Sequence, residues 1–481
     1  MVFNSLTYLL LLFFVVFIFW NISNKLRYYL IFLSSLIFYG FWRIDFIFLL
    51  LFSTTLDWFF ALKIFKSEDY VKKRYLFLSL FINLTLLFYF KYLIFFAENT
   101  IGFLNLLGVG IDPFLLKIIL PLGISFYTFQ TISYVIDVYR GSIKPEKNYI
   151  IYSSYVTFFP QLVAGPILRA NEVIPQFKKK NLFKWKYINE GLRRILYGLF
   201  LKVVLADNIA PLVDSGFDLP LETLSALDVW TLAFLFGIQI YFDFSGYSHI
   251  ALGSAKMIGI TLPENFNFPY ISSSPKDFWR RWHISLSSWV RDYIYLPLLN
   301  SKYQDSSSGG FSKTSLGNKD QKPLFITWTL MGLWHGANWT FLLWGLYHAL
   351  AIYIYRSLLK INKKLKIKPI FFIGCFFTTP IMMLAWIPFR AESIGDTVIM
   401  WSKILNPLNY FSLNLRENTY IVTLILIVGM TCTYFLREYL KKRKNRTSIF
   451  LNIWDTVIIS FIFGTCFIFL RPINQFIYFQ F

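Results

Sequence analysis

Charged residues are scarce in this sequence of 481 residues. They make up 15% of the chain, against roughly 25% in a soluble globular protein. Hydrophobic residues make up 56% and aromatic residues 21%, and the mean hydropathy is +0.53. This composition excludes a disordered protein and an ordinary cytosolic enzyme. Because apolar runs recur along nearly the whole length, it predicts a polytopic membrane protein.

Cysteine is also rare, and the familiar motifs of soluble enzymes are missing. The three cysteines, Cys375, Cys432 and Cys466, lie inside apolar segments without C-x-x-C spacing, as small packing residues do. The sequence has no Walker A motif, no G-x-G-x-x-G after a strand, no H-E-x-x-H and no Cys/His metal spacing. ATP-driven pumping and zinc hydrolysis therefore have no support, and we expect no metal and no tightly bound cofactor.

Acidic residues are outnumbered, with 26 Asp and Glu against 47 Lys and Arg, for a net charge of +21. Strongly basic loops separate some of the apolar runs: 63–74, 356–368 and 437–446. The loops 96–113 and 213–228 have no basic residue at all. This bias predicts the orientation of the chain in the membrane. The basic loops are expected in the cytoplasm and the N-terminus outside, provided that the short run 323–336 also crosses the membrane. No basic fold motif is present, so we expect no nucleic-acid partner.

Apolar runs long enough, or nearly long enough, to span a bilayer as helices recur along the chain. The runs are 6–20, 28–43, 44–62, 75–95, 114–138, 190–212, 226–247, 338–355, 368–388, 419–436 and 451–470. Two further runs, 150–166 and 277–299, are interrupted by prolines or charges and predict re-entrant or interfacial segments. The prediction is an all-α membrane protein with about 11 or 12 transmembrane helices. Leu6–Trp20 lacks the basic residues and cleavage pattern of a signal peptide and is interpreted as a retained span.

The expected organisation is a single membrane domain over residues 1–481, with further spans over 356–481. The longest polar stretch, 301–322, is rich in Ser, Gly and Lys and predicts a cytoplasmic loop. No soluble domain is apparent at either end, and no internal repeat of about 20–50 residues is visible.

Histidine occurs only four times, at His249, His283, His335 and His348. Ionisable residues in apolar segments are costly and are functional candidates by default. His335 lies in the sequence Leu-Trp-His-Gly-Ala-Asn-Trp, where Trp334 and Trp339 flank it as candidate walls of a cavity. An imidazole in such a site is a plausible general base. The alternative is a structural histidine bonded to a backbone carbonyl, which is the favoured interpretation of His348.

A second candidate site lies at 275–297, where Lys276, Arg280 and Arg281 alternate with aromatic residues such as Trp282. One interpretation is an interfacial amphipathic helix with arginines at the headgroups. The other is a re-entrant basic element that binds an anionic cofactor, with His283 as a titratable group beside it.

A third polar cluster spans 237–270 and includes Asp243 near the end of an apolar run. Its serines lack a G-x-S-x-G elbow, so no nucleophilic serine is predicted. Polar residues that satisfy one another at the end of a span are the favoured interpretation. Asn265, Asn267 and Pro269 predict a tight turn after this run.

Five stretches of the sequence form long, ordered motifs: FPQLVAGPILR, YFDFSGYSHIALG, LPENFNFPY, DFWRRWHISLSSWVRDYIYLPL and LMGLWHGANWTFLLWGLYHA. Together they resemble the membrane-bound O-acyltransferase family. They are most similar to the bacterial branch that acts in alginate O-acetylation and in D-alanyl transfer to teichoic acid. The resemblance covers a core of roughly residues 115–350 and implies helices around a central funnel.

The resemblance also implies roles for particular residues. The family's invariant histidine corresponds to His335 as catalytic base, and His283 corresponds to a second motif position as a helper. Lys276, Arg280, Arg281 and Trp282 are expected at the donor thioester. Asn338 or His283 is expected to donate to the oxyanion, with Trp334 and Trp339 lining the pocket. Relatives often have an acidic residue at the position of His249, so the resemblance assigns no role to His249.

The resemblance implies an enzyme, most simply an O-acetyltransferase, in the bacterial cytoplasmic (inner) membrane. The donor is expected to be acetyl-CoA or a thioester on an acyl carrier protein, and the acceptor a hydroxyl of an envelope polysaccharide such as alginate. An extracytoplasmic SGNH-type acyltransferase is expected to complete the transfer, with membrane lipids around the chain. D-alanyl or other acyl transfer, a lipid-directed acyltransferase, a secondary transporter and a passive scaffold are the alternatives.

Overall fold

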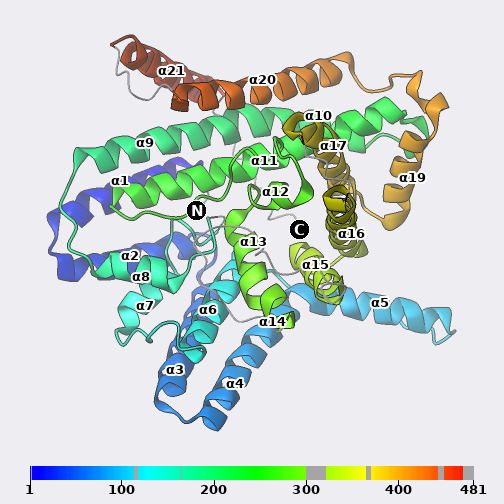
Figure 1. Cartoon of the computed structure of the whole chain (residues 1–481). Helices are drawn as coiled ribbons and strands as arrows, with labels where there is room; N and C mark the ends of the chain where they lie inside the picture. The colour runs from blue at the N-terminus through cyan, green and yellow to red at the C-terminus, as the bar shows by residue number, and fades with distance from the viewer. Residues whose placement is uncertain are drawn as a thin grey trace. The chain divides into compact units, whose positions relative to one another are not determined.

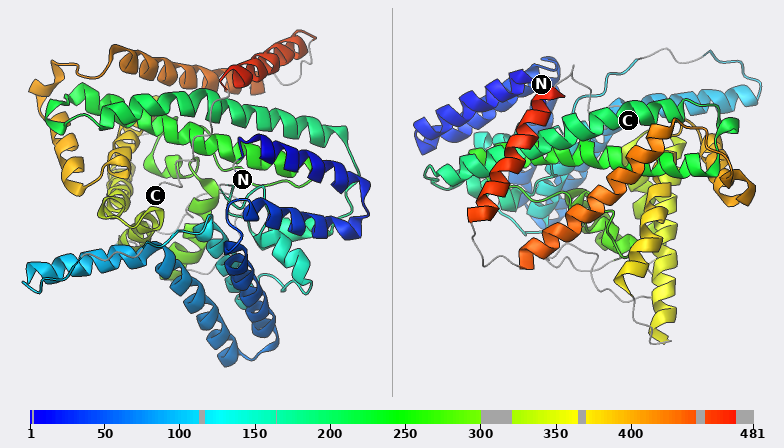
Figure 2. Two further views of the ribbon diagram at one scale, coloured as in Figure 1. Left: turned by 180° about the vertical axis from the view of Figure 1, so that it is seen from behind. Right: turned by 90° about the horizontal axis from the view of Figure 1, so that it is seen from above.

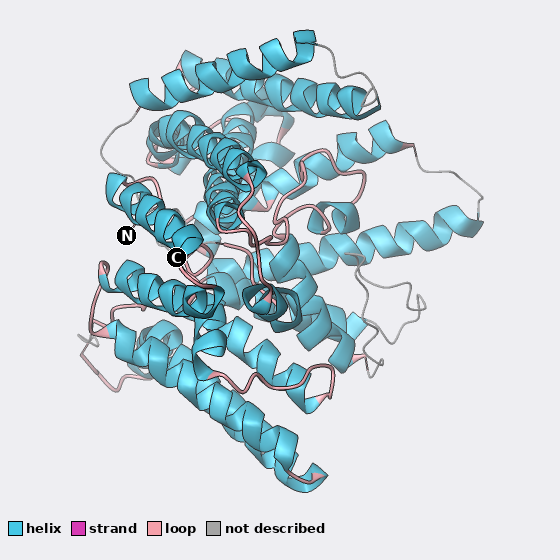
Figure 3. Ribbon diagram, turned by 90° about the vertical axis from the view of Figure 1, so that its left-hand side faces the viewer, coloured by secondary structure: helices cyan, strands magenta, loops and turns pink. Residues whose placement is uncertain are grey.

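The computed structural model describes residues 1, 3–112, 117–163, 165–299, 321–364, 370–442 and 449–469. Throughout these residues the regular secondary structure is helical, without a strand (Figure 3). The predicted all-α fold is therefore confirmed. Two compact units make up the chain: Met1–Ile195 with Tyr247–Glu264, and Leu196–Gly246 with Asn265–Phe481. One boundary falls inside α9 (Trp185–Leu199), one inside α11 (Ala226–Met257), and the third lies after Glu264, between α11 and the next helix.

The first unit consists of the N-terminal helices, the start of α9 and the end of α11. Its complete helices are α1 (Leu6–Asn21), α2 (Asn24–Gly40), α3 (Phe46–Lys66), α4 (Asp69–Leu87), α5 (Leu93–Leu106), α6 (Ile124–Tyr139), α7 (Tyr149–Val156) and α8 (Ala170–Lys178), with a π-helical turn at Phe88–Tyr92. Figures 1 and 2 show α3 and α4 as a hairpin. Buried Asp57 of α3 accepts hydrogen bonds from Ser79 Oγ (2.6 Å) and Asn83 Nδ2 (2.9 Å) of α4. These bonds satisfy a carboxylate that would otherwise be costly between two apolar helices.

The second unit contains the remaining helices. They are α10 (Asp207–Phe217), α12 (Pro275–Trp279), α13 (Ile284–Val290), α14 (Leu296–Leu298), α15 (Gln321–His335), α16 (Trp339–Lys364), α17 (Phe371–Leu384), α18 (Trp386–Arg390), α19 (Ile394–Leu405), α20 (Glu417–Lys442) and α21 (Ile449–Ile468). Two π-helical stretches, Phe200–Ala206 and Arg291–Tyr295, and two 3₁₀ turns, Leu221–Thr223 and Pro407–Tyr410, complete it.

Helices α15 and α16 form the most extensive helix pair of this unit (Figure 1). Gly332 of α15 and Gly345 of α16 face each other across it. A Cβ on Gly332 would overlap the carbonyl oxygen of Phe341, and one on Gly345 would overlap that of Trp328. Only glycine permits this backbone approach, so the two glycines bring the segment that carries His335 against α16.

Seven described helices are long and apolar enough to cross a membrane. They are Phe46–Lys66, Asp69–Leu106, Trp185–Phe217, Ala226–Met257, Trp339–Ile361, Phe371–Arg390 and Glu417–Lys441. The chain is therefore a multi-pass membrane protein. Among the other predicted spans, α1 is an apolar helix of only 16 residues, and α2, which holds most of the run 28–43, has 17 residues. In the span expected at 114–138, the prediction is wrong for the described residues 117–123, which are not helical, because α6 begins at Ile124 after the left-handed Gly123.

Both interrupted runs are broken into short elements. In the first, α7 ends at Val156, and the next helix does not begin until Ala170. The second is divided among α12, α13, a π-helical stretch and α14. Their re-entrant position stays a prediction. The loop expected at 301–322 lies outside the described residues except for Gln321 and Lys322, which begin α15.

Candidate active site

His335 is the last residue of α15 and is buried, with 4% of its surface exposed. Three aromatic rings surround its imidazole. Their centroids lie 4.7 Å away for Trp344, 4.9 Å for Trp334 and 5.3 Å for Phe389. This burial excludes bulk water from the imidazole, and a dry setting strengthens every electrostatic interaction formed there.

The break after His335 ends at Asn338, which caps α16. Its Oδ1 accepts a hydrogen bond from the backbone N–H of Thr340 at 3.0 Å, as an N-cap side chain does. The amide nitrogen of Asn338 is the group that its predicted oxyanion role would use. Trp334 is buried beside His335, whereas Trp339 is 48% exposed.

His283 is completely buried and precedes α13 in a left-handed conformation, with φ of 40°. A non-glycine residue in this region costs of order 1–3 kcal/mol, and such strain gathers at functional sites. The His283 Nδ1 atom lies 3.0 Å from Asn265 Oδ1, and the ring packs edge-on against Phe244 at 4.7 Å. Burial lowers the pKa of His283 to about 3, so the imidazole is neutral at physiological pH.

The structure brings His283 and His335 together around one indole. The Trp334 centroid lies 6.4 Å from the His283 ring and 4.9 Å from the His335 ring. The two histidines are 52 positions apart (335 − 283) and lie on separate helical segments. Their proximity follows from packing of the second unit, and their predicted roles stay predictions.

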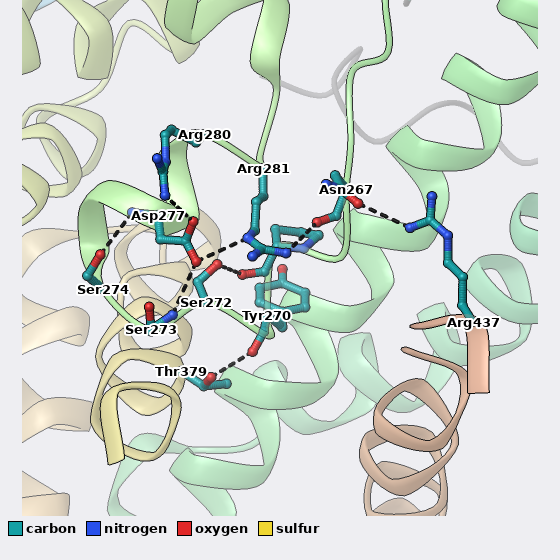
Figure 4. A network of polar contacts seen from close by, with 11 residues as sticks. Asn267, Tyr270, Ser272, Ser273, Ser274, Asp277, Arg280, Arg281, Thr379 and Arg437 are labelled. Carbon is teal, nitrogen blue, oxygen red and sulfur yellow. Dashed lines mark hydrogen bonds and ion pairs between the residues drawn. The ribbon is translucent and has the colours of Figure 1, made fainter. Parts of the chain in front are cut away.

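One carboxylate holds the two arginines that directly follow α12, as Figure 4 shows. Asp277 accepts from Arg280 Nη2 at 2.8 Å and from Arg281 Nε at 3.1 Å. Ser274 Oγ in turn accepts from the Asp277 backbone N–H and begins the helix. Asp277 thus fixes two guanidinium groups that the sequence analysis treated as separate donor-binding residues.

Lys276 belongs to a cluster of three cations. Its pKa is lowered first by burial and then by the positive charges of Arg280 and Arg356. Arg356, on α16, was not predicted, because 76 residues separate it from Arg280 (356 − 280). Its Nη2 donates to Tyr295 Oη at 3.1 Å. Three neighbouring cations repel one another, and an anion would relieve that repulsion.

The same short helix links this cluster to the histidines. Trp279 packs against Trp328 at 4.6 Å, His348 at 5.0 Å and Trp344 at 5.7 Å. His348 is buried among these indoles and lies 4.5 Å from Trp344, the ring that also contacts His335. Aromatic packing therefore extends from α12 to His335 without a break.

Trp282 lies in a different environment from the cations next to it in sequence. It is buried and stacks on Phe278 with an interplanar angle of 11°, and Trp386 lies 4.9 Å away. This packing is that of a core residue, and contact with a donor stays a prediction.

Two other polar residues are engaged elsewhere. In the first unit, His249 Nδ1 accepts a hydrogen bond from Arg194 Nε at 3.2 Å, and Arg194 also pairs with Glu264. In the second unit, Asp243 pairs with buried Lys202 at 2.9 Å. Asp243 therefore has a structural partner, in agreement with the favoured interpretation of its cluster.

Comparison with known proteins identifies the class. The sequence profile of MBOAT, the membrane-bound O-acyltransferase family, matches residues 145–387, which include His283 and His335. The helical membrane fold and this match define a polytopic membrane acyltransferase. The chain belongs to the membrane-bound O-acyltransferase family, and it is an enzyme.

Three relatives show the range of the family near this chain. A probable alginate O-acetylase AlgI of Azotobacter vinelandii is 37% identical over 425 residues, covering 86% of this chain and 81% of that protein. A peptidoglycan O-acetyltransferase of Helicobacter pylori is 36% identical over 393 residues, covering 76% and 71%. A teichoic acid D-alanyltransferase of Bacillus subtilis is 31% identical over 254 residues, covering 52% and 62%.

Proposed function

We propose that this chain transfers an acetyl group from a cytoplasmic thioester to a hydroxyl of a cell-envelope polysaccharide, with His335 as the general base. The burial of His335 among three aromatic rings is the observation that carries this proposal. The names of the relatives that are 36–37% identical favour acetyl as the group, since they describe O-acetylation of alginate and of peptidoglycan.

In the proposed reaction, the acceptor hydroxyl attacks the carbonyl carbon of the thioester. His335 takes the hydroxyl proton as the new C–O bond forms, and the proton then passes to the thiolate as the C–S bond breaks. General base catalysis of this kind contributes about 10²–10⁴-fold to the rate. Fixed orientation of both substrates in a confined site adds to it.

The donor is acetyl-CoA or an acyl carrier protein thioester, and its phosphates meet Lys276, Arg280 and Arg281. Two features support this placement: the guanidinium groups are held in position by Asp277, and Lys276 already feels excess positive charge. Arginine in a fixed geometry suits phosphate recognition.

The chain acts in the inner membrane, and an extracytoplasmic SGNH-type acyltransferase completes the transfer to the polymer. This division of labour rests on the resemblance to the bacterial branch of the family. Co-purification without such a partner, together with direct acetylation of the polymer by the isolated chain, would argue against it.

The test is the acetyl ester content of the cell envelope in a deletion strain complemented with wild type, His335→Ala or His249→Gln. His249 is the matched control because it is a histidine of the other compact unit to which no role is assigned. Wild type and His249→Gln should restore the ester, and His335→Ala, present at equal level, should not. Restoration by His335→Ala would refute the assignment and favour a transporter or scaffold.

D-alanyl transfer is the second candidate, supported by the similarity to the teichoic acid D-alanyltransferase. Mass spectrometry of the acyl groups released from the envelope by mild base separates acetate from D-alanine. A long-chain acid in the lipid fraction would instead identify a lipid-directed acyltransferase.

A further inference from the structure

The side chain of Asn265 holds the segment that carries His283. Its Oδ1 lies 3.0 Å from His283 Nδ1, 2.9 Å from Ser285 Oγ and 3.3 Å from the Ser285 backbone nitrogen. The Asn265 carbonyl also accepts from the Ile284 N–H at 3.0 Å. A further hydrogen bond runs from the Asn267 N–H to the Arg281 carbonyl at 2.9 Å. These contacts together join residues 265–267 to residues 281–285.

This arrangement determines which ring nitrogen of His283 carries the proton. A backbone N–H only donates, so the Asn265 atom that faces Ser285 is the amide oxygen and not the amide nitrogen. That oxygen only accepts, so His283 Nδ1 must be the donor across the 3.0 Å contact. A neutral imidazole has one N–H, and its lone pair is therefore on Nε2.

The surroundings keep His283 in this neutral form. Phe244 of α11 and Trp334 of α15 contact the ring from two sides, and Phe266 stacks on it at 6.5 Å. None of these three side chains titrates, and completely buried apolar surroundings disfavour a second proton on the ring.

We propose that Asn265 is a positioning residue that fixes His283 as the Nδ1–H tautomer, so that His283 meets the substrates through Nε2 as a hydrogen-bond acceptor. This role rests on the proposed acyl transfer and deepens it. In this role, His283 Nε2 accepts a hydrogen bond from a substrate O–H or N–H group. That group is either the hydroxyl to be acylated or an amide N–H of the thioester arm. Because Nε2 then carries no proton, His283 does not donate to the oxyanion, which is the role that the family resemblance implied.

Nitrogen-15 NMR of the protein in lipid, labelled only at histidine, tests the tautomer without any activity. The chain has four histidines, and the signals absent from His283→Gln assign those of His283. We expect a protonated Nδ1 and an unprotonated Nε2 in wild type and in Ser285→Ala, which keeps the Asn265 oxygen. Asn265→Ala should lose this preference. A protonated Nε2 in wild type, or an unchanged tautomer in Asn265→Ala, would overturn the proposal.

The pH profile of Asn265→Asp tests the acceptor role. The carboxylate accepts the same hydrogen bonds but adds a negative charge beside Nδ1, which raises the pKa of His283. Below the new pKa, Nε2 becomes a donor, so transfer from acetyl-CoA in membranes should fall about tenfold one pH unit below it. Wild type and Ser285→Ala should lack this additional limb and keep only the one set by protonation of the general base, His335.

The opposite result is equally clear. If His283 serves as a donor, Asn265→Asp will be faster than wild type at low pH, and the proposal is wrong. Wild-type membranes that transfer no acetyl group would refute the proposed function instead, while the NMR result would still decide the tautomer.

Discussion

Lys202 lies in a buried triad whose loss has a calculable effect on stability. Its ammonium group, 2% exposed, lies 2.8 Å from Asp207 Oδ1 and 2.9 Å from Asp243 Oδ1. The substitution Lys202→Met preserves the apolar stem but leaves two carboxylates without their cation. Removing one partner of a buried ion pair costs about 3–5 kcal/mol. Asp207 is 18% exposed and regains some hydration. We therefore expect the free energy of unfolding to fall by about 3 kcal/mol, the lower end of this range.

The assay is thermal unfolding in detergent, followed by loss of the monodisperse peak in size-exclusion chromatography. Lys202→Met should unfold at a distinctly lower temperature than wild type. The double variant Lys202→Met/Asp243→Asn should recover much of the loss, because it removes the more deeply buried of the two charges. The matched control is Lys256→Met, since Lys256 of α11 pairs with Glu190 of α9, which is 42% exposed. Such a pair contributes roughly 0–1 kcal/mol.

Two outcomes would refute this reasoning. If Lys202→Met unfolds at the same temperature as Lys256→Met, the buried triad contributes no more than an exposed pair, and the burial argument is wrong. A double variant no more stable than Lys202→Met would show that the uncompensated charge of Asp243 is not the source of the loss.

Three other perturbations test the organisation of the candidate site. Asp277→Ala releases Arg280 and Arg281, so the KM for acetyl-CoA should rise several-fold and become more salt-sensitive while kcat changes less; an unchanged KM in steady-state assays would contradict the proposed donor contact. Gly332→Val inserts a side chain between α15 and α16, so folded protein recovered from membranes should fall sharply, whereas recovery equal to wild type would show that the helices separate freely. The pKa of His283 is lowered to about 3 from 6.5, so its contribution to stability is complete above pH 6.5 and is lost as pH falls toward 3. In that window the free energy of unfolding changes by up to about 1.4 kcal/mol per pH unit. The difference in this free energy between wild type and His283→Gln, measured by unfolding at several pH values, should therefore shrink as the pH falls. A constant difference would contradict this reasoning.

Much of the helical architecture could be predicted because bilayer-length apolar runs leave helices as the simplest way to satisfy the backbone. The expected runs 226–247 and 419–436 lie within α11 and α20, and the run 44–62 lies in α3 from Phe46 onward. Helix ends were less predictable, because they depend on single residues. Helix α6 begins only at Ile124, directly after the left-handed Gly123, although the apolar run begins earlier.

The candidate site was predictable only where its residues are neighbours in sequence. Trp334 lies next to His335, so their contact follows directly. Phe389 reaches the same imidazole from α18, and no local pattern identifies that contact. Asn265 was interpreted as a turn residue, and its bond to His283 spans 18 positions. Such pairs form when the chain folds back, which periodicity and spacing do not reveal.

The electrostatic detail was also hidden in the sequence. Arg280 and Arg281 were predicted as donor-binding residues from their charge alone. Their shared carboxylate, Asp277, makes them a fixed pair, and Arg356 joins Lys276 and Arg280 from a distant helix. Charge can be counted from a sequence, whereas the arrangement of charges requires the fold.

The most direct measurement of the central claim uses the purified chain in proteoliposomes with radiolabelled acetyl-CoA and an extract of envelope polysaccharide together with its periplasmic proteins. Wild type should move label into base-labile ester, and His335→Ala, folded to the same extent, should be slower by about 10²-fold or more. Label transfer by His335→Ala at the wild-type rate would contradict the account.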